Sequence, residues 1–176
     1  TYGDWSSDVC SSDLYTLLAF GSSMWVVPFM QEVTYDTLRD LVTITQIVRS
    51  PNVLVIHPAV QANSVKELIA LAKARPGVLN YGSSVSGGSP HLAAEMFKYM
   101  AGIDIVRVAY RGVAPAVTDL IAGQVQLMFP TAASGMPHAK VGRLRALAIT
   151  TAQPSAMYPE LPTMAASGLP NYEMVA

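Results

Sequence analysis

The residues of this chain best suited to chemistry form one stretch rich in glycine and serine. Its sequence is Asn80-Tyr-Gly-Ser-Ser-Val-Ser-Gly-Gly-Ser-Pro-His-Leu-Ala-Ala-Glu-Met-Phe97. Ser89 is a favourable helix N-cap and Pro90 suits the first helical position, so the pattern predicts a strand, a loop and then a helix. The amides of His91 and Leu92 would then lack intrahelical acceptors, and together with the positive helix end they would attract a carboxylate or a phosphate.

A loop of this kind binds an anion with backbone amides and hydroxyls and supplies no reactive group. It contributes six candidate ligand-binding residues: Ser84, Ser86, Gly87, Gly88, Ser89 and His91. A purely structural interpretation stays open, because turns between strands and helices often contain glycine and serine only to reverse the chain.

A serine hydrolase is the alternative function that the same loop suggests. The segment from Gly82 to Ser86 is the nearest thing to a nucleophile elbow, but it lacks the final glycine of that motif. His91 is close in sequence, yet a histidine in a first helical turn is more often a partly exposed cap residue than a general base. An α/β hydrolase-like enzyme that uses Ser84 or Ser86 is therefore the second hypothesis, and the first predicts no catalytic residue.

Other kinds of site find little support in the sequence. No lysine follows the glycines as a P-loop requires, and the three histidines fit no metal-ligand spacing, so we predict neither a metal nor a cofactor. The net charge is −1 and no long basic cluster occurs, which argues against nucleic-acid binding. The apolar runs are too short to cross a bilayer, so we expect no direct membrane insertion.

The first residues of the chain differ from the rest. The segment from Asp4 to Leu14 has no apolar period and resembles the conceptual translation of a common short-read sequencing adapter. We therefore set residues 1–14 aside as not native. Cys10, the single cysteine, falls in this segment, and no signal peptide is visible.

From Tyr15 onward, short apolar runs alternate with amphipathic segments, which predicts an α/β fold with a mostly parallel sheet. The expected strands cover residues 15–20, 41–48, 52–57, 79–81, 105–109, 124–129 and 144–150. The expected helices cover residues 24–30, 64–76, 113–122 and 135–141, in addition to the helix that begins at Pro90.

The loops at the carboxyl ends of these strands are the expected ligand edge, because α/β sheets bind their ligands there. They are residues 83–89, 110–114 and 130–134, with residues 21–23 on the earlier piece of the chain. These loops add four candidate ligand-binding residues: Ser22, Ser23, Tyr110 and Thr131.

Several motifs, in one order, resemble the Bug-type substrate-binding receptors of tripartite tricarboxylate transporters. They are Pro51-Asn-Val-Leu-Val-Ile-His-Pro58, Asn80-Tyr-Gly-Ser-Ser84, Pro90-His-Leu-Ala-Ala-Glu-Met-Phe97, Tyr110-Arg-Gly-Val-Ala-Pro-Ala116, Asp119-Leu-Ile-Ala-Gly-Gln-Val125 and Leu144-Arg-Ala-Leu-Ala-Ile-Thr150. The resemblance extends over residues 15–176, and its specificity comes from the order and spacing of the motifs.

The resemblance implies a periplasmic binding protein of two lobes that is not an enzyme. A loop from each lobe would grip the carboxylates of a small ligand, which the receptor would deliver to membrane permease subunits. By this comparison residues 15–50 are part of the first lobe, 51–170 are a nearly complete second lobe, and 171–176 begin the return to the first.

Two positions depart from the family pattern. Pro130 stands where the family usually has aspartate, and Arg111 stands where it usually has lysine. Arginine keeps the charge, whereas proline removes both an acceptor side chain and an amide donor. The departure at Pro130 puts the role of the third loop, residues 130–134, in doubt.

Overall fold

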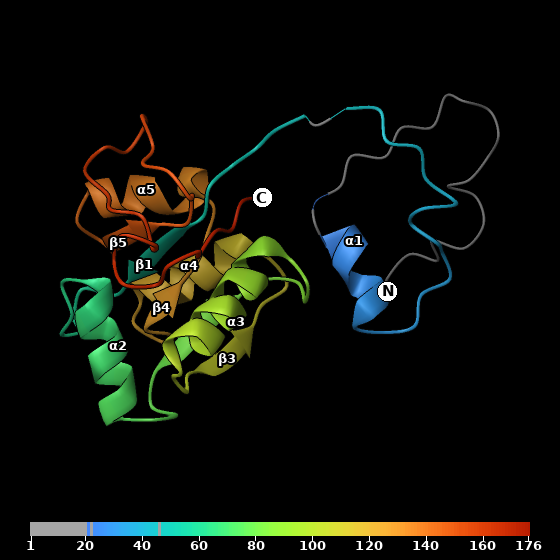
Figure 1. Cartoon of the computed structure of the whole chain (residues 1–176). Helices are drawn as coiled ribbons and strands as arrows, with labels where there is room; N and C mark the ends of the chain where they lie inside the picture. The colour runs from blue at the N-terminus through green and yellow to red at the C-terminus, as the bar shows by residue number, and fades with distance from the viewer. Residues whose placement is uncertain (1–20, 22, 46) are drawn as a thin grey trace.

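The structure is a computed structural model that describes residues 21, 23–45 and 47–176. A five-stranded sheet in the order β3-β2-β4-β1-β5 lies within the larger body of the structure, on the left in Figure 1. The strands are β1 (Val53–Ile56), β2 (Asn80–Ser83), β3 (Val106–Ala109), β4 (Leu127–Met128) and β5 (Arg145–Ile149). The helices are α1 (Ser23–Val26), the 3-10 turn η2 (Val27–Phe29), α2 (Val65–Ala74), α3 (Ser89–Ala101), α4 (Val113–Ile121) and α5 (Ala132–Lys140).

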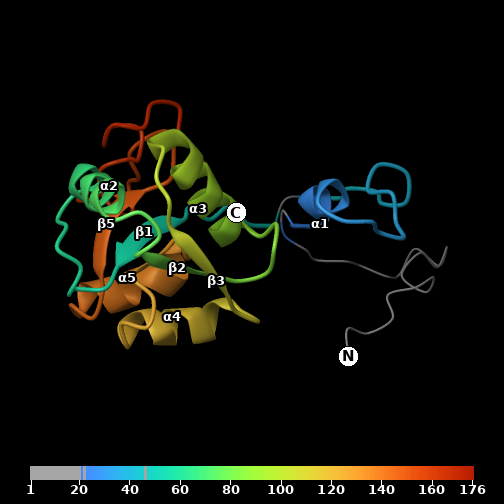
Figure 2. The same ribbon diagram turned by 90° about the horizontal axis from the view of Figure 1, so that it is seen from below.

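Helices cover both faces of this sheet. Helices α2 and α3 lie on one face, and α4 and α5 lie on the other (Figure 2). Successive side chains of a strand point to opposite faces, so Leu54 and Ile56 of β1 join the core under α2 and α3. Val53 and Val55 join the core under α4 and α5. The expectation of an α/β fold is confirmed, and β1 is buried on both faces.

The strand directions gather several loops at one edge. Strand β2 is parallel to both β3 and β4, whereas β1 is antiparallel to β4 and β5. The sheet is therefore mixed, with β1 running against the other four strands. The carboxyl ends of β2, β3, β4 and β5 share an edge with the start of β1. We call this edge the loop edge.

Helix α2 begins as its sequence predicts. The hydroxyl of Ser64 accepts a hydrogen bond from the amide of Glu67 at 3.2 Å. The carboxylate of Glu67 accepts from the amide of Asn63 at 2.7 Å, one residue before the position that a standard capping box would use. Two amides at the helix start are thereby satisfied without help from outside the segment.

The start of α3 differs from the prediction. The N-cap is Gly88, and Ser89 is the first helical residue. The carbonyl oxygen of Gly88 accepts from the amides of both His91 and Leu92 at 3.0 Å. The expectation of free amides at these two residues is therefore wrong. The cause is a tight turn in which the amide of Gly88 donates to Val85 O at 3.1 Å, so that the helical bonds begin one residue early.

The described part of the chain before residue 49 contributes nothing to either core cluster. The strand expected at residues 41–48 is absent from the residues of that range that the structure describes. Val42, Ile44 and Val48 are 90%, 77% and 69% exposed, and no neighbouring strand pairs with them. A strand needs such a partner for its backbone hydrogen bonds, and here the described chain offers none. The expected strand at 15–20 and the segment 1–14 lie outside the described residues.

Residues 49–176 contain the sheet and both core clusters, and we call them the sheet domain. Two segments run side by side where the chain enters and leaves this domain. The amide of Ser50 donates to Ala176 O at 2.8 Å, and the amide of Ala176 donates back to Ser50 O at 2.8 Å. An ion pair of 3.2 Å between Arg49 and Glu173 adds to this pairing. The lobe boundaries proposed from the sequence stay predictions.

Candidate functional site

The loop between β2 and α3 is held in shape by its own histidine. The amide of Gly87, at φ +77°, donates to Nδ1 of His91 at 3.1 Å. Because Nδ1 is an acceptor, the neutral imidazole carries its proton on Nε2. Burial, and then the positive charge of Arg107, lowers the pKa of His91 below its ordinary value of 6.5. Burial and the nearby cation therefore favour the neutral form of the ring, which this bond requires.

The hydroxyls of the loop are available to a ligand. Ser84 is 8% exposed, Ser89 is 7% exposed, and neither hydroxyl has a hydrogen-bond partner within the described chain. Among the described residues, Oδ1 of Asn52 is the one fully buried side-chain nitrogen or oxygen atom that lacks a hydrogen-bond partner. The hydroxyls of Ser84 and Ser89 also lack partners but are not in that class, so both reach solvent. Ser86 is exposed outright. These residues can donate hydrogen bonds to an anion.

Arg107, on β3, organises the same loop, and the sequence did not single it out. Its Nε donates to Ser83 Oγ at 2.7 Å, its Nη1 to Ser86 Oγ at 3.1 Å and its Nη2 to Ser84 O at 3.1 Å. One guanidinium thus fixes three residues of the loop. The signal that could have found it is a charged residue in the middle of an otherwise apolar strand, from Ile105 to Ala109.

A second polar cluster, formed by Tyr81, Glu95 and Lys98, connects β2 to α3. The hydroxyl of Tyr81 donates to the carboxylate of Glu95, which also pairs with Lys98 at 3.4 Å. Burial and then the Glu95 carboxylate raise the pKa of Tyr81 far above its usual range, so the phenol keeps its proton. Burial raises the pKa of Glu95, but the bond from Tyr81 and the charge of Lys98 outweigh it and lower the pKa. The Glu95 charge is thereby largely balanced by Lys98.

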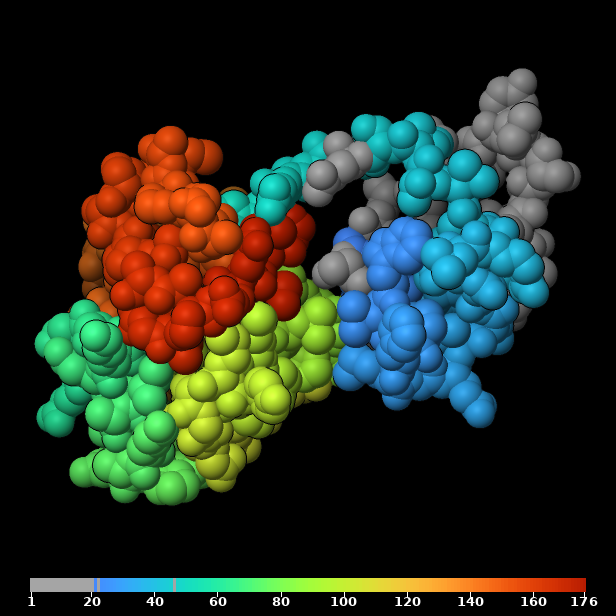
Figure 3. All heavy atoms as spheres, in the orientation of Figure 1, coloured from blue at the N-terminus to red at the C-terminus, as the bar shows by residue number. Residues whose placement is uncertain are grey.

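The first described helix approaches the loop at Gly87 (Figure 3). A Cβ atom on Gly87 would lie 3.5 Å from Cγ2 of Val27 and 3.6 Å from Sδ of Met30. The segment formed by α1 and η2, which contains Ser23, therefore forms an apolar wall beside the serine-rich loop. Ser22 lies outside the described residues.

Two predicted site residues, Tyr110 and Thr131, lie on the loop edge with their hydroxyls already in use. Tyr110 donates to Oδ2 of Asp119 at 2.8 Å. Its ring belongs to the core under α4 and α5, on the opposite sheet face from Arg107. Burial and then the Asp119 carboxylate raise the pKa of Tyr110 to about 12. Thr131 Oγ1 lies 3.1 Å from Ser134 Oγ in the first turn of α5.

Pro130, one of the departures noted from the sequence, has a packing role. It is buried, and its carbonyl oxygen accepts from the amide of Val53 at 2.9 Å. A Cβ atom on Gly135 would lie only 2.9 Å from Cγ of Pro130 and 3.0 Å from Cγ2 of Val53. The proline ring therefore occupies the space that the glycine leaves, and it offers no side-chain group to a ligand.

The hydrolase hypothesis finds no support in this geometry. His91 Nδ1 accepts from a backbone amide, and Ser86 Oγ accepts from Arg107. The nearest carboxylate on α3, Glu95, is bonded to Tyr81 and Lys98. No serine, histidine and carboxylate are linked by hydrogen bonds in the described part of the loop. Within the described residues no group of three potential metal ligands is present, and no helix is long and apolar enough to cross a membrane.

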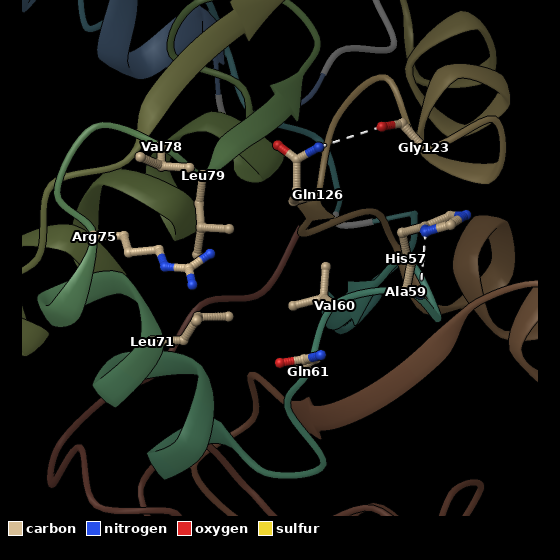
Figure 4. A pocket seen from close by; sticks show the side chains of 10 residues that line it. All are labelled: His57, Ala59, Val60, Gln61, Leu71, Arg75, Val78, Leu79, Gly123 and Gln126. Carbon is tan, nitrogen blue, oxygen red and sulfur yellow. Dashed lines mark hydrogen bonds between the residues drawn. The ribbon is translucent and has the colours of Figure 1, made fainter.

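A hollow of about 460 Å³ lies at the other edge of the sheet (Figure 4). His57 and Gln126 contribute polar atoms to it, but both side chains bond backbone groups nearby. His57 Nδ1 accepts from Ala59 N at 3.2 Å, and Gln126 Nε2 donates to Gly123 O at 3.2 Å. We place the candidate site at the loop edge instead, because several hydroxyls and backbone amides without partners in the described chain lie close together there.

Comparison with known proteins gives consistent matches. The sequence model of the family described as "Tripartite tricarboxylate transporter family receptor" matches residues 7–176, a range that begins within the segment set aside above. The protein BugT of Bordetella pertussis is 36% identical over 165 residues, which are 92% of this chain and 51% of BugT.

Solved structures agree with the sequence matches. The R. palustris protein Rpa4515, solved with adipate, superposes with a TM-score of 0.77 at 38% identity, over 80% of this chain and 47% of that one. A structure described as a periplasmic transporter gives a TM-score of 0.79 at 34% identity, over 88% of this chain and 51% of the other. The chain thus spans about half the length of the relatives that it matches.

Proposed function

The chain belongs to the tripartite tricarboxylate transporter receptor family, and on that basis we propose that it forms part of a receptor that captures a small organic acid. The loop from Ser84 to His91 would hold one carboxylate of the ligand. The observation that carries the proposal is the set of hydroxyls and amides on this loop that have no partner within the described chain.

The chemistry of these groups favours an ionised carboxylate. Within the described chain, the amides of Ser86 and Ser89 have no backbone acceptor, and neither do the hydroxyls of Ser84 and Ser89. A carboxylate accepts hydrogen bonds only, and bonds from neutral donors to a charged acceptor are stronger than bonds between neutral groups. The dipole of α3, a helix of 13 residues, adds positive potential at the same place.

The other predicted residues take different places in the proposal. Gly87 and Gly88 shape the loop, and Ser22 and Ser23 would approach the ligand from the first lobe. Tyr110 and Thr131 would frame the loop edge rather than donate, because their hydroxyls are engaged by Asp119 and Ser134.

The family also supports a proposal for the place of the receptor in the cell and for its partners. We propose that it works in the periplasm, binds without catalysis and delivers its ligand to membrane permease subunits. The names of its relatives support this proposal: one is a periplasmic transporter, and another was solved with adipate, a dicarboxylate.

Calorimetric titration of the full-length product of the gene tests the proposal. The acids to use are adipate, malate, citrate and benzoate, each near neutral pH. We expect at least one of them to bind with a stoichiometry of one and no heat of turnover. Failure of every acid to bind would contradict the proposal, and a continuous heat signal after mixing would indicate an enzyme instead.

A further inference from the structure

Arg107 differs from Lys98, the other cation on this side of the sheet near the loop, because the positive charge of Arg107 is not paired. Lys98 lies 3.4 Å from Glu95, so those two charges largely cancel. None of the ion pairs in the described chain includes Arg107. Its guanidinium is half-buried and bonds only neutral oxygens. A cation held in this way beside a ligand site attracts an anion and repels a cation.

The hydrogen bonds of Arg107 also set the direction of a loop hydroxyl. A guanidinium donates and cannot accept, so Ser86 Oγ must be the acceptor in its 3.1 Å bond with Nη1. The single hydroxyl proton of Ser86 then points away from Arg107. Because Ser86 is exposed, that proton is free to donate to a ligand.

The strand register places Arg107 on the same face of the sheet as helix α3. Strands β2 and β3 are parallel with Tyr81 opposite Arg107, so both side chains lie on the face covered by α3. Tyr110, on the other face, is turned toward α4 and bonds Asp119. From this register a single arginine reaches Ser83, Ser84 and Ser86.

We propose that Arg107 is a positioning residue that makes the loop a hydrogen-bond donor and selects ionised carboxylates over neutral ligands of the same shape. The inference rests on the proposed function, because it concerns how that site tells its ligand from analogues. Arg107 acts through the serines and through its charge, and it does not need to touch the ligand.

Binding of adipate and of its neutral counterpart adipamide to the full-length gene product tests this inference. The variants are Arg107→Met, which removes the charge and all three bonds, and Arg107→Lys, which keeps the charge. Arg143→Met is the matched control, since Arg143 is exposed and lies on the opposite sheet edge. Should adipate not bind the unmodified protein, the tightest binder among malate, citrate and benzoate replaces it, together with the corresponding amide.

We expect Arg107→Met to weaken acid binding by about 10-fold to 100-fold, the range for hydrogen bonds and charges of this kind. Amide binding should change little, so the preference for the acid falls. The dependence of acid affinity on salt should also become weaker, because less charge attracts the ligand. Arg107→Lys should recover part of the lost affinity, and Arg143→Met should leave both ligands unaffected.

Three outcomes would overturn the inference. The first is that Arg107→Met binds the acid as tightly as the unmodified protein does. Equal weakening of acid and amide with an unchanged salt dependence is another, because it would indicate a merely structural role. If Arg107→Met does not fold, Arg107→Lys decides, and a lysine variant without any loss of affinity would show that the three bonds are unimportant. Absence of binding by the unmodified protein to every acid would instead refute the proposed function itself.

Discussion

The amide of Gly87 donates to Nδ1 of His91 across 3.1 Å, and this bond closes the serine-rich loop onto the first turn of α3. The two residues are four positions apart, and the left-handed backbone of Gly87, with φ +77°, is what turns its amide toward the ring. This bond therefore acts together with the three bonds from Arg107 to hold the loop that carries the proposed ligand donors.

Substitution of the glycine should weaken both the fold and the site. Gly87→Ala places a side chain in the left-handed region, which costs about 1 kcal/mol of folding free energy. Its Cβ finds ordinary contact distances to Val27 and Met30, so strain rather than a clash is the cause. Gly102→Ala is the matched control, because Gly102 has φ +60° and open space around it. Urea unfolding should show similar losses for both variants, whereas only Gly87→Ala should weaken carboxylate binding in calorimetry. Equal binding by the two would contradict a role for the Gly87 turn in the site.

His91 should make stability depend on pH below about neutrality. Its pKa in the folded protein lies below the ordinary value of 6.5, so as the pH falls the unfolded chain takes up the proton first. The stabilising contribution is therefore complete above pH 6.5 and is lost as the pH falls through the lower folded pKa. Within that window the free energy of unfolding falls by at most about 1.4 kcal/mol per pH unit.

The measurement is urea unfolding of the full-length gene product at a series of pH values from 8 to 4.5. His91→Asn keeps an acceptor for the Gly87 amide and should flatten the curve in this window. His138→Asn, which changes a histidine far from the loop on α5, should leave its shape intact. A His91→Asn curve with the same slope as the unmodified protein would exclude His91 as the source.

Gly135→Ala should destabilise the protein, although glycine to alanine inside a helix usually stabilises it by about 1 kcal/mol. The new Cβ would lie 2.9 Å from the ring of Pro130, closer than such atoms can approach. We expect a loss of about 1–3 kcal/mol in urea unfolding, as for other overpacked cores. The double variant Pro130→Ala with Gly135→Ala should recover much of that loss, because the ring atom is gone. A stabilising Gly135→Ala would show that the packing here is looser than described.

The segment before residue 49 should make the 176-residue chain associate when it is expressed alone. Phe29 is 90% exposed and Leu38 is 86% exposed, and neither belongs to a core cluster. Light scattering should show aggregates for residues 1–176 and a monomer for residues 49–176, which keep both clusters and the pairing of Ser50 with Ala176. A monomeric and sharply melting 176-residue chain would contradict this expectation.

Local sequence predicted the elements of the sheet domain well. The uninterrupted apolar run in β1 indicated a strand buried on both faces, and Leu54 and Val55 indeed join opposite cores. The Ser64 and Glu67 pair located the start of α2, because capping depends on neighbours only. The strand predicted at residues 41–48 is absent from the residues of that range that the structure describes. The apolar alternation of Val42 and Ile44 cannot form a strand without a partner.

The serine-rich loop shows where local information ends. Its composition alone determined that hydroxyls and amides would gather between β2 and α3, and the order of motifs determined the family. Which groups stay open was decided by the folded chain, because Gly88, rather than Ser89, caps α3 and its carbonyl takes two of the expected donors.

The position of the Arg107 charge beside the loop was likewise decided by tertiary structure. The parallel register of β2 and β3 sets Arg107 opposite Tyr81 and within reach of Ser83 and Ser86, and strand pairing of this kind is a long-range property. A sequence specifies backbone preferences through neighbours, whereas contacts between distant segments form only when the whole core is packed. The amino-acid sequence therefore determined the donors of this site, and the packed sheet decided their direction and their charge.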